Sequence, residues 1–479
     1  MIITRDIIRS DTTINDYSKN DLCEFINYWK IKLLDLDAKP GDKIGLSFDT
    51  GEIHYYALIF AAFELGMRVV SLHRPNNKKE CQSPKSNAHL PLDYYVYLSD
   101  YLGNPLTSNA VRHFKKNSKR SISYGQLEWQ TSGETFRSNV ETPVYAQPDD
   151  IAFCCTSSGT TGNPKLITYT HKFLFDLMQH NWKDIGYCEN DVMLHFSSLN
   201  HGGVITLLLP SLMKCKGHYF QTFSPDENRI VSTIKECINN NVTKIFFANG
   251  SELTLFIDTL CQYDLKLPET TILLLSFISP NWCNAIRIGK LKSIDSMFGC
   301  SEVGGPVFVP RLDADNVDYF NPRYLGKPTN SFYRTIVANG NIYISTSYTG
   351  IFKFDDVVKE KPNGYYFVSK KRLQKINDID INPLDIVEIL ERYTTRYKFE
   401  IYLDEIYNQL YVLTTDKSVY EQKEKIKAEI NSFYHDNVTV TDIILEPELY
   451  EATINNKADK DKLAGIVERF RLTSQKNSI

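Results

Sequence analysis

The chain has 479 residues and a formal net charge of −4, from 54 basic and 58 acidic side chains. Apolar residues make up 42% and aromatic residues 12%, which is enough for a large core and excludes a disordered or collagen-like chain. The near balance of charge argues against binding to nucleic acid or to a membrane surface, and the length allows two to three domains.

The beginning of the chain, from Met1 to Asp6, contains no long apolar segment, so no secretory signal is expected. No run approaches the roughly 18 apolar residues of a membrane span, so we expect no membrane insertion. The 10 cysteines form no Cys-x-x-Cys pair and no set with zinc spacing. We therefore expect a reduced, cytoplasmic protein.

Short apolar strands alternate with apolar helices in the first half of the chain. The sequence predicts a helix at 53–65 and strands at 43–48, 68–72, 151–155, 244–247 and 271–275. An order of strand, helix and strand is typical of parallel pairing, with the helices covering the faces of the sheet. This half therefore predicts an α/β fold built on parallel or mixed sheets.

The pattern changes from about Asn339, where β-rich segments replace the alternation. Strands are predicted at 342–345 and 365–368, followed by a basic cluster, a helix at 386–392, strands at 400–403 and 409–413, and a helix at 420–433. We expect a large N-terminal domain, residues 1–370, that includes a β-rich subdomain. A small α+β C-terminal lid, residues 371–479, is expected to follow it.

The most informative segment follows the strand at 151–155 and combines hydroxyl residues with glycines before a final lysine. It consists of Thr156, Ser157, Ser158, Gly159, Thr160, Thr161, Gly162, Asn163, Pro164 and Lys165. Hydroxyls and backbone N–H groups in such a turn donate converging hydrogen bonds to phosphate oxygens, and the lysine adds a positive charge. The loop lacks the Walker A ending and the dinucleotide fingerprint. It predicts a phosphate-binding loop rather than a polar surface turn.

This loop, with Thr170 and His171 behind it and further motifs in order, resembles the adenylate-forming superfamily over almost the whole chain. That superfamily contains acyl-CoA synthetases, adenylation domains of non-ribosomal peptide synthetases, and luciferases. The resemblance implies that the loop holds the β- and γ-phosphates of ATP. It also implies an AMP-forming acid–thiol ligase that uses ATP and Mg²⁺ to form an acyl-adenylate and then transfers the acyl group. A mobile C-terminal lid would carry the catalytic lysine.

Residues 298–302, Phe-Gly-Cys-Ser-Glu, look like the family motif of an aromatic residue, Gly, any residue, Thr and Glu. By resemblance, Phe298 stacks against adenine with Gly299 beside it, and Ser301 binds the α-phosphate. Glu302 would be catalytic and would hold Mg²⁺, since a hard cation prefers a carboxylate. Outside this context, a Ser-Glu pair is typical of a helix cap.

The segment Phe354-Asp355-Asp356 is similar to the family's Thr-Gly-Asp motif. Its final aspartate accepts hydrogen bonds from both ribose hydroxyls, which makes Asp356 the candidate. Asp355 in that role, or a solvated acidic turn, are the alternatives. The family's Gly-Arg pair is replaced here by Val368-Ser369 or by Ser369-Lys370, and Lys370 is a further candidate ATP ligand.

The segment from Thr453 to Lys460 looks like the family motif that carries the catalytic lysine, with Asn456 in place of a glycine. By resemblance, Lys457 bridges the substrate carboxylate and the α-phosphate. The alternative is that Lys457, Lys460 and Lys462 form one solvated helix face.

The hinge between the domains falls at Lys371, or at Arg372 if the register slips by one residue. Asp378 replaces a family glycine that lies beside the pantetheine tunnel, so the sequence supports the adenylation step more strongly than the transfer to CoA. By resemblance, the expected acceptor is CoA or the phosphopantetheine of a carrier protein supplied in trans. Because of Asp378, an amine is the alternative. A sensor or scaffold that binds an adenylate without turnover is the competing class of function.

The segment from Ser198 to Gly203 resembles the stretch of acyl- and aryl-CoA synthetases that carries His-x-x-Gly or His-Gly-Gly. Ser197 stands where relatives that activate amino acids carry an aspartate, so an α-ammonium group would lack its ion pair. An aryl or acyl carboxylate is therefore favoured over an amino acid. His201 either lines the acid or acceptor pocket, with a catalytic role, or begins a helix. The segment from Leu275 to Pro280, with the pocket candidates Ser276 and Phe277, stands where relatives commonly have a glycine pair, and the bulky Phe277 and Ile278 would narrow the acid pocket or shift the adenine wall.

Overall fold

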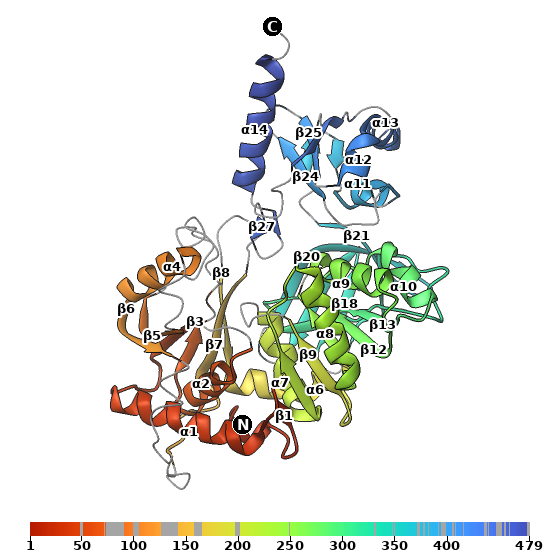
Figure 1. Ribbon diagram of the computed structural model, residues 1–479. Helices are drawn as coiled ribbons and strands as arrows, with labels where there is room; N and C mark the ends of the chain where they lie inside the picture. The colour runs from red at the N-terminus through yellow and green to blue at the C-terminus, as the bar shows by residue number, and fades with distance from the viewer. Residues whose placement is uncertain are drawn as a thin grey trace.

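The chain is described by a computed structural model, drawn as a ribbon in Figure 1. The described residues are 1–47, 51–70, 72, 91–98, 105–125, 142–157, 165–196, 202–248, 250–329, 332–346, 348, 350–370, 374–376, 379–381, 383–390, 392–393, 399–404, 407, 409–414, 416–434, 438, 440–446, 453–454, 457–458 and 460–476. The predicted α/β class is confirmed, with large helix-flanked sheets followed by a small α+β region.

The first sheet has six strands. Their order is β6 (Ser118–Tyr124), β5 (Leu92–Leu98), β3 (Lys43–Ser47), β4 (Arg68–Val70), β7 (Ile151–Ser157) and β8 (Lys165–Thr170). Strands β3 to β7 pair in parallel, as the sequence predicts, and β8 is antiparallel to β7. Ser157, at the end of β7, and Lys165, at the start of β8, therefore lie side by side at one end of the sheet.

Three helices accompany this sheet: α1 (Lys19–Asp35), α2 (Ile53–Glu64) and α4 (Pro105–Lys116). A capping box starts α1, because Ser18 and Asp21 each accept a hydrogen bond from the backbone N–H of the other. Every residue of α2 is buried, which fits a helix that is apolar on all sides. Glu64, at its end, lies 2.6 Å from Arg5 and 2.8 Å from Lys30, so one buried carboxylate joins the N-terminus to both helices.

The second sheet has eight strands. Their order is β16 (Arg311–Asp313), β13 (Leu291–Ser296), β12 (Leu267–Leu274), β11 (Lys244–Phe247), β9 (Val192–His195), β10 (Gly217–Phe220), β1 (Thr13–Ile14) and β2 (Tyr17–Ser18). The six inner strands are parallel and the two outer strands antiparallel. Its helical segments are α6 (His171–Ile185), α7 (Gly202–Lys214), α8 (Glu227–Asn239), α9 (Gly250–Gln262), η3 (Pro280–Trp282) and α10 (Cys283–Arg287).

The β-rich part follows. A hairpin of β14 (Phe298–Cys300) and β15 (Gly305–Phe308) leads into a five-stranded antiparallel sheet. The order of this sheet is β17 (Tyr324–Gly326), β21 (Gly364–Lys370), β20 (Gly350–Lys361), β19 (Asn341–Thr346) and β18 (Arg334–Ala338). The strands predicted at 342–345 and 365–368 lie within β19 and β21.

The C-terminal region has its own sheet, β24 (Phe399–Asp404), β25 (Gln409–Thr414) and β26 (Val440–Leu445). Its helices are α11 (Pro383–Leu390), α12 (Lys417–Glu421), α13 (Lys423–Phe433) and α14 (Lys460–Lys476), and its strand pairs are β22 (Gln374–Ile376) with β23 (Ile379–Ile381) and β27 (Thr453–Ile454) with β28 (Lys457–Ala458). The helix predicted at 420–433 is present as α13, which ends at Phe433 as predicted, but a break at Gln422 separates it from α12. The expected helix at 386–392 begins earlier and ends at Leu390.

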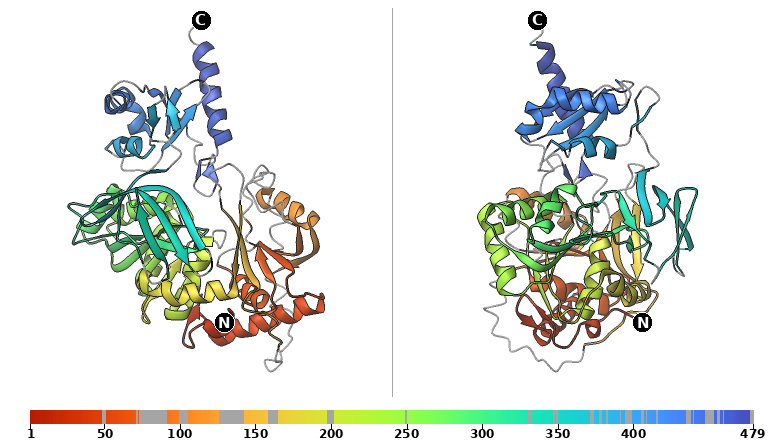
Figure 2. Two further views of the ribbon diagram at one scale, coloured as in Figure 1. Left: turned by 180° about the vertical axis from the view of Figure 1, so that it is seen from behind. Right: turned by 90° about the vertical axis from the view of Figure 1, so that its right-hand side faces the viewer.

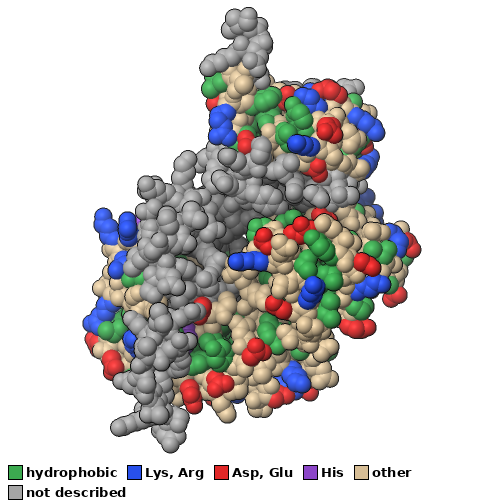
Figure 3. Space-filling view, viewed as in Figure 1, with side chains coloured by type: hydrophobic (Ala, Val, Ile, Leu, Met, Phe, Trp, Pro, Cys, Tyr) green, Lys and Arg blue, Asp and Glu red, His purple; other side chains and the backbone are tan. Residues whose placement is uncertain are grey.

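The C-terminal region forms a separate lobe beside the large sheets, as the two views of Figure 2 agree. The buried apolar clusters follow the same division: the clusters of the large part contain buried residues between Ile3 and Phe367, and those of the C-terminal lobe contain residues between Ile376 and Val467. On the face in Figure 3, acidic and basic side chains are interspersed over the described surface. None of the described helices has the length and apolar character needed to cross a membrane.

Candidate functional site

The two ends of the predicted phosphate loop lie at the paired ends of β7 and β8. Thr156 and Ser157 end β7, Lys165 begins β8, and Ser157 pairs directly with Lys165 across the ladder. The intervening residues of the motif, Ser158, Gly159, Thr160, Thr161 and Gly162, lie outside the described residues. The structure thus brings the two ends of the loop together at a strand end, where phosphate-binding turns commonly occur.

His171, directly behind this hairpin, has a structural partner. Its Nδ1 accepts a hydrogen bond from the backbone N–H of Ile3 at 3.2 Å, and its ring packs against Phe63. Burial lowers the pKa of His171 from its ordinary value of 6.5 to about 4, so the imidazole is neutral near pH 7. Its contacts anchor the N-terminus of the chain against the start of α6.

Ser301 and Glu302 lie half-buried in the turn between β14 and β15. No described helix begins at this turn, so the alternative of a helix cap is wrong. A Cβ atom on Gly299 would lie 2.3 Å from the carbonyl oxygen of Gly305 on the opposite strand. Glycine at this position lets the two strands approach, and it fixes where the turn projects its side chains.

An aromatic cluster surrounds Phe298. Its ring lies 5.8 Å from Phe277 and 6.3 Å from both Phe354 and Phe367, with the Phe354 ring nearly parallel to it. The structure therefore brings Phe298 and Phe277, predicted from two separate segments, to one surface. Sequence reasoning missed Phe354 and Phe367 as wall residues. The residue pattern along β20 and β21 could have indicated on which face of the sheet Phe354 and Phe367 lie. It could not have indicated that both lie beside Phe298.

Asp356 lies on β20, two residues after Phe354, and is half-buried. It pairs with Lys370 across the β20–β21 ladder, so the structure places these two ATP-binding candidates opposite each other. The alternative of an acidic turn is wrong, because Asp355 and Asp356 lie within a 12-residue strand. Two candidates predicted from separate motifs thus share one strand pair near the aromatic cluster.

Lys457 begins β28, which pairs with β27, and Lys460 begins α14. The alternative of one helix face containing both lysines is therefore wrong, since Lys457 lies on a strand. Figures 1 and 2 show the β27–β28 hairpin on the side of the C-terminal lobe that faces the large part, toward the end of the β7–β8 hairpin. The backbone of Lys457 thus lies between the lobe and the strands that carry the phosphate loop.

Several predicted residues lie outside the described part of the chain. These are the pocket candidates Ser197 and His201, the hinge candidates Lys371 and Arg372, and Asp378, which replaces a glycine of the family motif. Ser276 is described and exposed, and its backbone carbonyl accepts a hydrogen bond from the Ser296 hydroxyl at 2.7 Å. That bond fixes the loop that carries Phe277 to the end of β13.

The donor set of the turn fits Mg²⁺ that is shared with nucleotide phosphates. Glu302 has no ion pair with any described residue, and the described residues contain no cluster of three or more His, Cys, Asp or Glu able to hold a metal ion. Burial and the nearby Glu302 carboxylate raise the pKa of the Cys300 thiol, so Cys300 stays protonated and is a poor ligand. One carboxylate beside phosphate oxygens is a usual Mg²⁺ arrangement.

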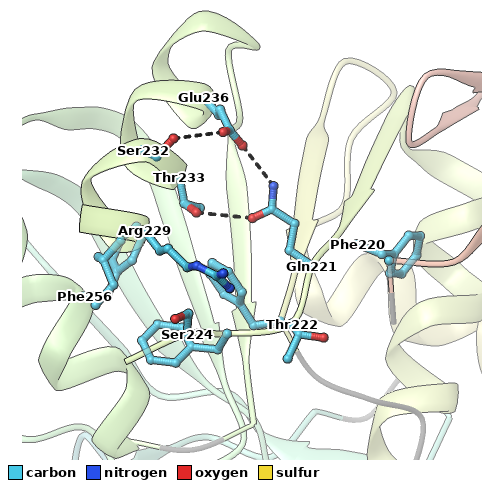
Figure 4. A pocket seen from close by; sticks show the side chains of 13 residues that line it. Phe220, Gln221, Thr222, Ser224, Arg229, Ser232, Thr233, Glu236 and Phe256 are labelled. Atoms are coloured by element: carbon cyan, nitrogen blue, oxygen red, sulfur yellow. Dashed lines mark hydrogen bonds between the residues drawn. The ribbon is translucent and has the colours of Figure 1, made fainter. Parts of the chain in front are cut away.

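A cavity of about 370 Å³ opens at the carboxyl ends of β9 and β10 (Figure 4). Phe196, Phe223 and Phe256 are among the residues that line it, as is the exposed Arg229 of α8. Gln221 is held in place by hydrogen bonds with Glu236 at 3.0 Å and with Thr233 at 3.3 Å. Phe196, which lines this cavity, directly precedes Ser197 in the chain.

A family model described as AMP-binding enzyme matches residues 32–337. Long-chain-fatty-acid–CoA ligase 1 of Cavia porcellus is 31% identical over 103 residues, which are 21% of this chain and 14% of that protein. The chain therefore aligns with only a small part of that curated relative.

Solved structures of similar fold cover nearly the whole chain. A McyG A-PCP complexed with phenylalanyl-adenylate has a TM-score of 0.75 and 16% identity, over 99% of this chain and 97% of that one. The anthranilate CoA ligase AuaEII in complex with anthranoyl-AMP has a TM-score of 0.73 and 13% identity, over 97% of each chain. At these identities the likeness concerns the fold, which extends through the C-terminal lobe.

Proposed function

The chain belongs to the AMP-binding enzyme family of adenylate-forming enzymes, and we propose that it activates an aryl or acyl carboxylic acid with ATP and transfers it to a thiol. The observation that carries this proposal is the convergence of separate motifs around one turn. Phe298 and Glu302 lie on one hairpin, and the ring of Phe298 lies 6.3 Å from that of Phe354, two residues before Asp356 on the distant strand β20. Such a set offers an aromatic wall for a base, a carboxylate for a ribose and a carboxylate for a metal ion.

In this proposal, ATP lies between the β7–β8 hairpin and the β14–β15 turn. The loop from Thr156 to Lys165 holds the β- and γ-phosphates, and Ser301 binds the α-phosphate. Phe298 stacks on adenine, and Asp356 accepts hydrogen bonds from the ribose hydroxyls. Lys370, opposite Asp356 in the ladder, is a further ligand of the nucleotide.

Glu302 would hold Mg²⁺ together with phosphate oxygens, and the bound cation would neutralise charge on the phosphates as the substrate carboxylate attacks the α-phosphorus. The protein's own part is to position the two reactants and to stabilise developing charge. Lys457 would bridge the carboxylate and the α-phosphate from the C-terminal lobe. The reaction yields an acyl-adenylate and pyrophosphate.

We propose that residues 371–479 form the mobile domain, with its hinge at Lys371 or Arg372. The separate buried clusters of the large part and the lobe support this division, because rigid-body motion leaves both cores intact. Rotation of the lobe would withdraw Lys457 after adenylation and give the acceptor access. A rearrangement of this size is a candidate rate-limiting step.

The aromatic side chains that line the cavity with Phe196 support an aryl or acyl substrate, since they offer apolar surface at the residue that precedes Ser197. Ser197 in place of an aspartate argues against an amino acid, as an unpaired ammonium group would be costly there. The solved relatives carry adenylates of both kinds, phenylalanyl and anthranoyl. CoA or a carrier protein's phosphopantetheine is the proposed acceptor, and Asp378 keeps an amine as the alternative.

The test is ATP–pyrophosphate exchange with a panel of aryl, fatty and amino acids, because exchange needs no acceptor. We expect Mg²⁺-dependent exchange with one aryl or acyl acid and none with amino acids. Exchange only with an amino acid would overturn the substrate class. Silence across a broad panel, with ATP binding intact, would favour a sensor or scaffold.

A further inference from the structure

The β14–β15 turn is supported from beneath by aromatic side chains of other elements. Gly304 has a φ of +79°, and a Cβ atom there would lie 2.8 Å from the ring of Phe173 on α6. A Cβ on Gly305 would lie 2.5 Å from the hydroxyl of Tyr333. The turn that carries Ser301 and Glu302 therefore rests directly on neighbouring rings, with no room for side chains between them.

Tyr169 ties this turn to the strand that begins at the end of the phosphate loop. Its hydroxyl donates a hydrogen bond of 2.5 Å to the backbone carbonyl of Ser301. It lies on β8, four residues after Lys165, and its ring stacks on Phe173 with centroids 5.4 Å apart. One hydroxyl thus connects the hairpin assigned to the β- and γ-phosphates with the turn assigned to the α-phosphate and Mg²⁺.

Tyr333 holds the other side of the same turn. Its hydroxyl donates a 3.0 Å hydrogen bond to the backbone carbonyl of Val303. Burial raises the pKa of both Tyr169 and Tyr333 well above the usual value, so each hydroxyl keeps the proton that it donates. The two anchored carbonyls, those of Ser301 and Val303, stand on either side of Glu302 in the chain.

We propose that Tyr169 and Tyr333 are positioning residues that clamp the turn, holding Ser301 and Glu302 where MgATP requires them. The proposal rests on the proposed function, since it assumes that this turn binds the α-phosphate and the metal ion. Neither tyrosine is assigned contact with the nucleotide. Each acts on it through the backbone of the turn.

The chain provides a matched control for this clamp. Tyr187 is also 2% exposed, as are Tyr169 and Tyr333, and its hydroxyl donates a 3.2 Å hydrogen bond to the carbonyl of Leu207 on α7. That bond serves a helix rather than the turn. Removing the Tyr187 hydroxyl deletes a buried hydrogen bond of the same kind, so its variant reports the general cost of such a loss.

The experiment compares the full-length Y169F, Y333F and Y187F variants with the wild type by calorimetric titration. ATP is titrated once with excess Mg²⁺ and once with EDTA. We expect Y169F to weaken binding of MgATP by about five- to tenfold and Y333F by about threefold, because the net contribution of one buried hydrogen bond corresponds to a change in Kd of this size. In EDTA only the contact of Ser301 with the α-phosphate is affected, so binding of ATP should weaken clearly less than binding of MgATP, and Y187F should match the wild type in both titrations.

The clamp is overturned if Y169F binds MgATP as tightly as Y187F does, or if its loss is equal with and without Mg²⁺. The first result would mean that the turn holds its place without the bond, and the second would indicate general destabilisation. Thermal unfolding checks folding, and Y169F and Y187F should lose similar stability.

Failure of the clamp is distinguishable from failure of the proposed function. If the wild type exchanges pyrophosphate and Y169F binds MgATP normally, only the clamp fails. If the wild type binds MgATP but activates no acid, the proposed function fails, and a Mg²⁺-specific loss in Y169F still supports the clamp. A wild type that binds no MgATP would overturn both.

Discussion

The large part of the molecule and its C-terminal lobe hold their predicted site residues in different ways. In the large part, Phe298 and Glu302 lie on a hairpin that is packed against neighbouring rings, and Asp356 lies within a long strand. In the lobe, Lys457 lies on β28, a strand of two residues. Its hairpin projects from a lobe with buried clusters of its own.

This difference fits a division of labour. A binding surface for ATP gains from preorganisation, because aligned groups need no rearrangement when charge develops in the transition state. A lysine that must arrive for one half-reaction and leave for the next gains from a short hairpin on a separate lobe. The predictions below test this contrast, beginning with the largest expected effect.

Replacing the carboxylate in the turn should have the greatest consequence. For Glu302→Gln we expect pyrophosphate exchange to fall on the order of 100- to 1000-fold, since the amide is a weak ligand for Mg²⁺ and charge on the phosphates is no longer neutralised. Exchange rates over a series of Mg²⁺ concentrations check this. The exposed Glu269 on β12 offers a control, and Glu269→Gln should behave as the wild type. Equal rates in the two variants would contradict the assignment of Glu302.

Acid should destabilise the large part before the lobe. Burial lowers the pKa of His54 and His171 to about 4 and that of His218 to about 3, from an ordinary 6.5. In the unfolded chain these histidines bind protons below about pH 6.5, whereas in the folded protein they stay neutral until the pH approaches 4. The free energy of unfolding is therefore highest above pH 6.5 and decreases as the pH falls toward 4. We expect a loss of a few kcal/mol between pH 6.5 and 5, roughly 1.4 kcal/mol per histidine for each pH unit at most.

Hydrogen exchange at pH 7 and pH 5 checks this contrast, because it reports on each region separately. The lobe contains one histidine, His435, whereas β9, β10 and α6 contain the buried His195, His218 and His171, so protection in the lobe should change less than in those elements. Carboxylates titrate mainly below this window. Equal loss of protection in both regions would contradict the account.

The aromatic wall should matter less than the metal site. For Phe298→Ala we expect the KM for ATP to rise by about tenfold, because an aromatic pair contributes about 0.5–1.5 kcal/mol beyond its buried area. Phe298→Tyr keeps the ring and should stay within about twofold of the wild type. Steady-state kinetics at saturating acid measure both. A change in kcat alone, with KM for ATP unaltered, would argue that Phe298 does not border the base.

The smallest effect concerns an ion pair between the two regions. Arg323, just before β17, forms an ion pair with Asp385 on α11, and both side chains are mostly buried. We expect Arg323→Ala or Asp385→Asn to lower exchange by about two- to fivefold, since losing up to about 1 kcal/mol reduces the population of the docked lobe. The double variant should lose no more than either single variant. If the loss of exchange in the double variant equalled the product of the two single losses, the two residues would act independently.

The elements of the large part were the most predictable from sequence. Strands such as β3 and β11 are short apolar runs, and the apolar helix α2 between strands indicates parallel pairing. The lobe was harder: one amphipathic pattern covered α12 and α13, and it gave no sign that Gln422 breaks the helix. A period of 3.6 residues continues through such a break, because both helices turn the same face inward.

The motifs of the site could be found in sequence, and their supports could not. Phe298, Glu302 and Asp356 stand in a recognisable order, whereas Tyr169 looks like any buried residue of an alternating strand. Its hydroxyl meets Ser301, 132 positions away, and nothing local to either segment encodes that contact. Long-range hydrogen bonds of this kind follow from the packing of the sheets.

The most direct test of the division between a fixed ATP surface and a mobile lysine is the Lys457→Ala variant, compared with Lys460→Ala. ATP binding and pyrophosphate exchange are measured on each full-length protein with the activated acid. The account predicts that Lys457→Ala binds MgATP within about twofold of the wild type but loses exchange on the order of 100-fold or more, while Lys460→Ala keeps both. Exchange that survives in Lys457→Ala would contradict the account, because the large part would then catalyse adenylation without the lysine.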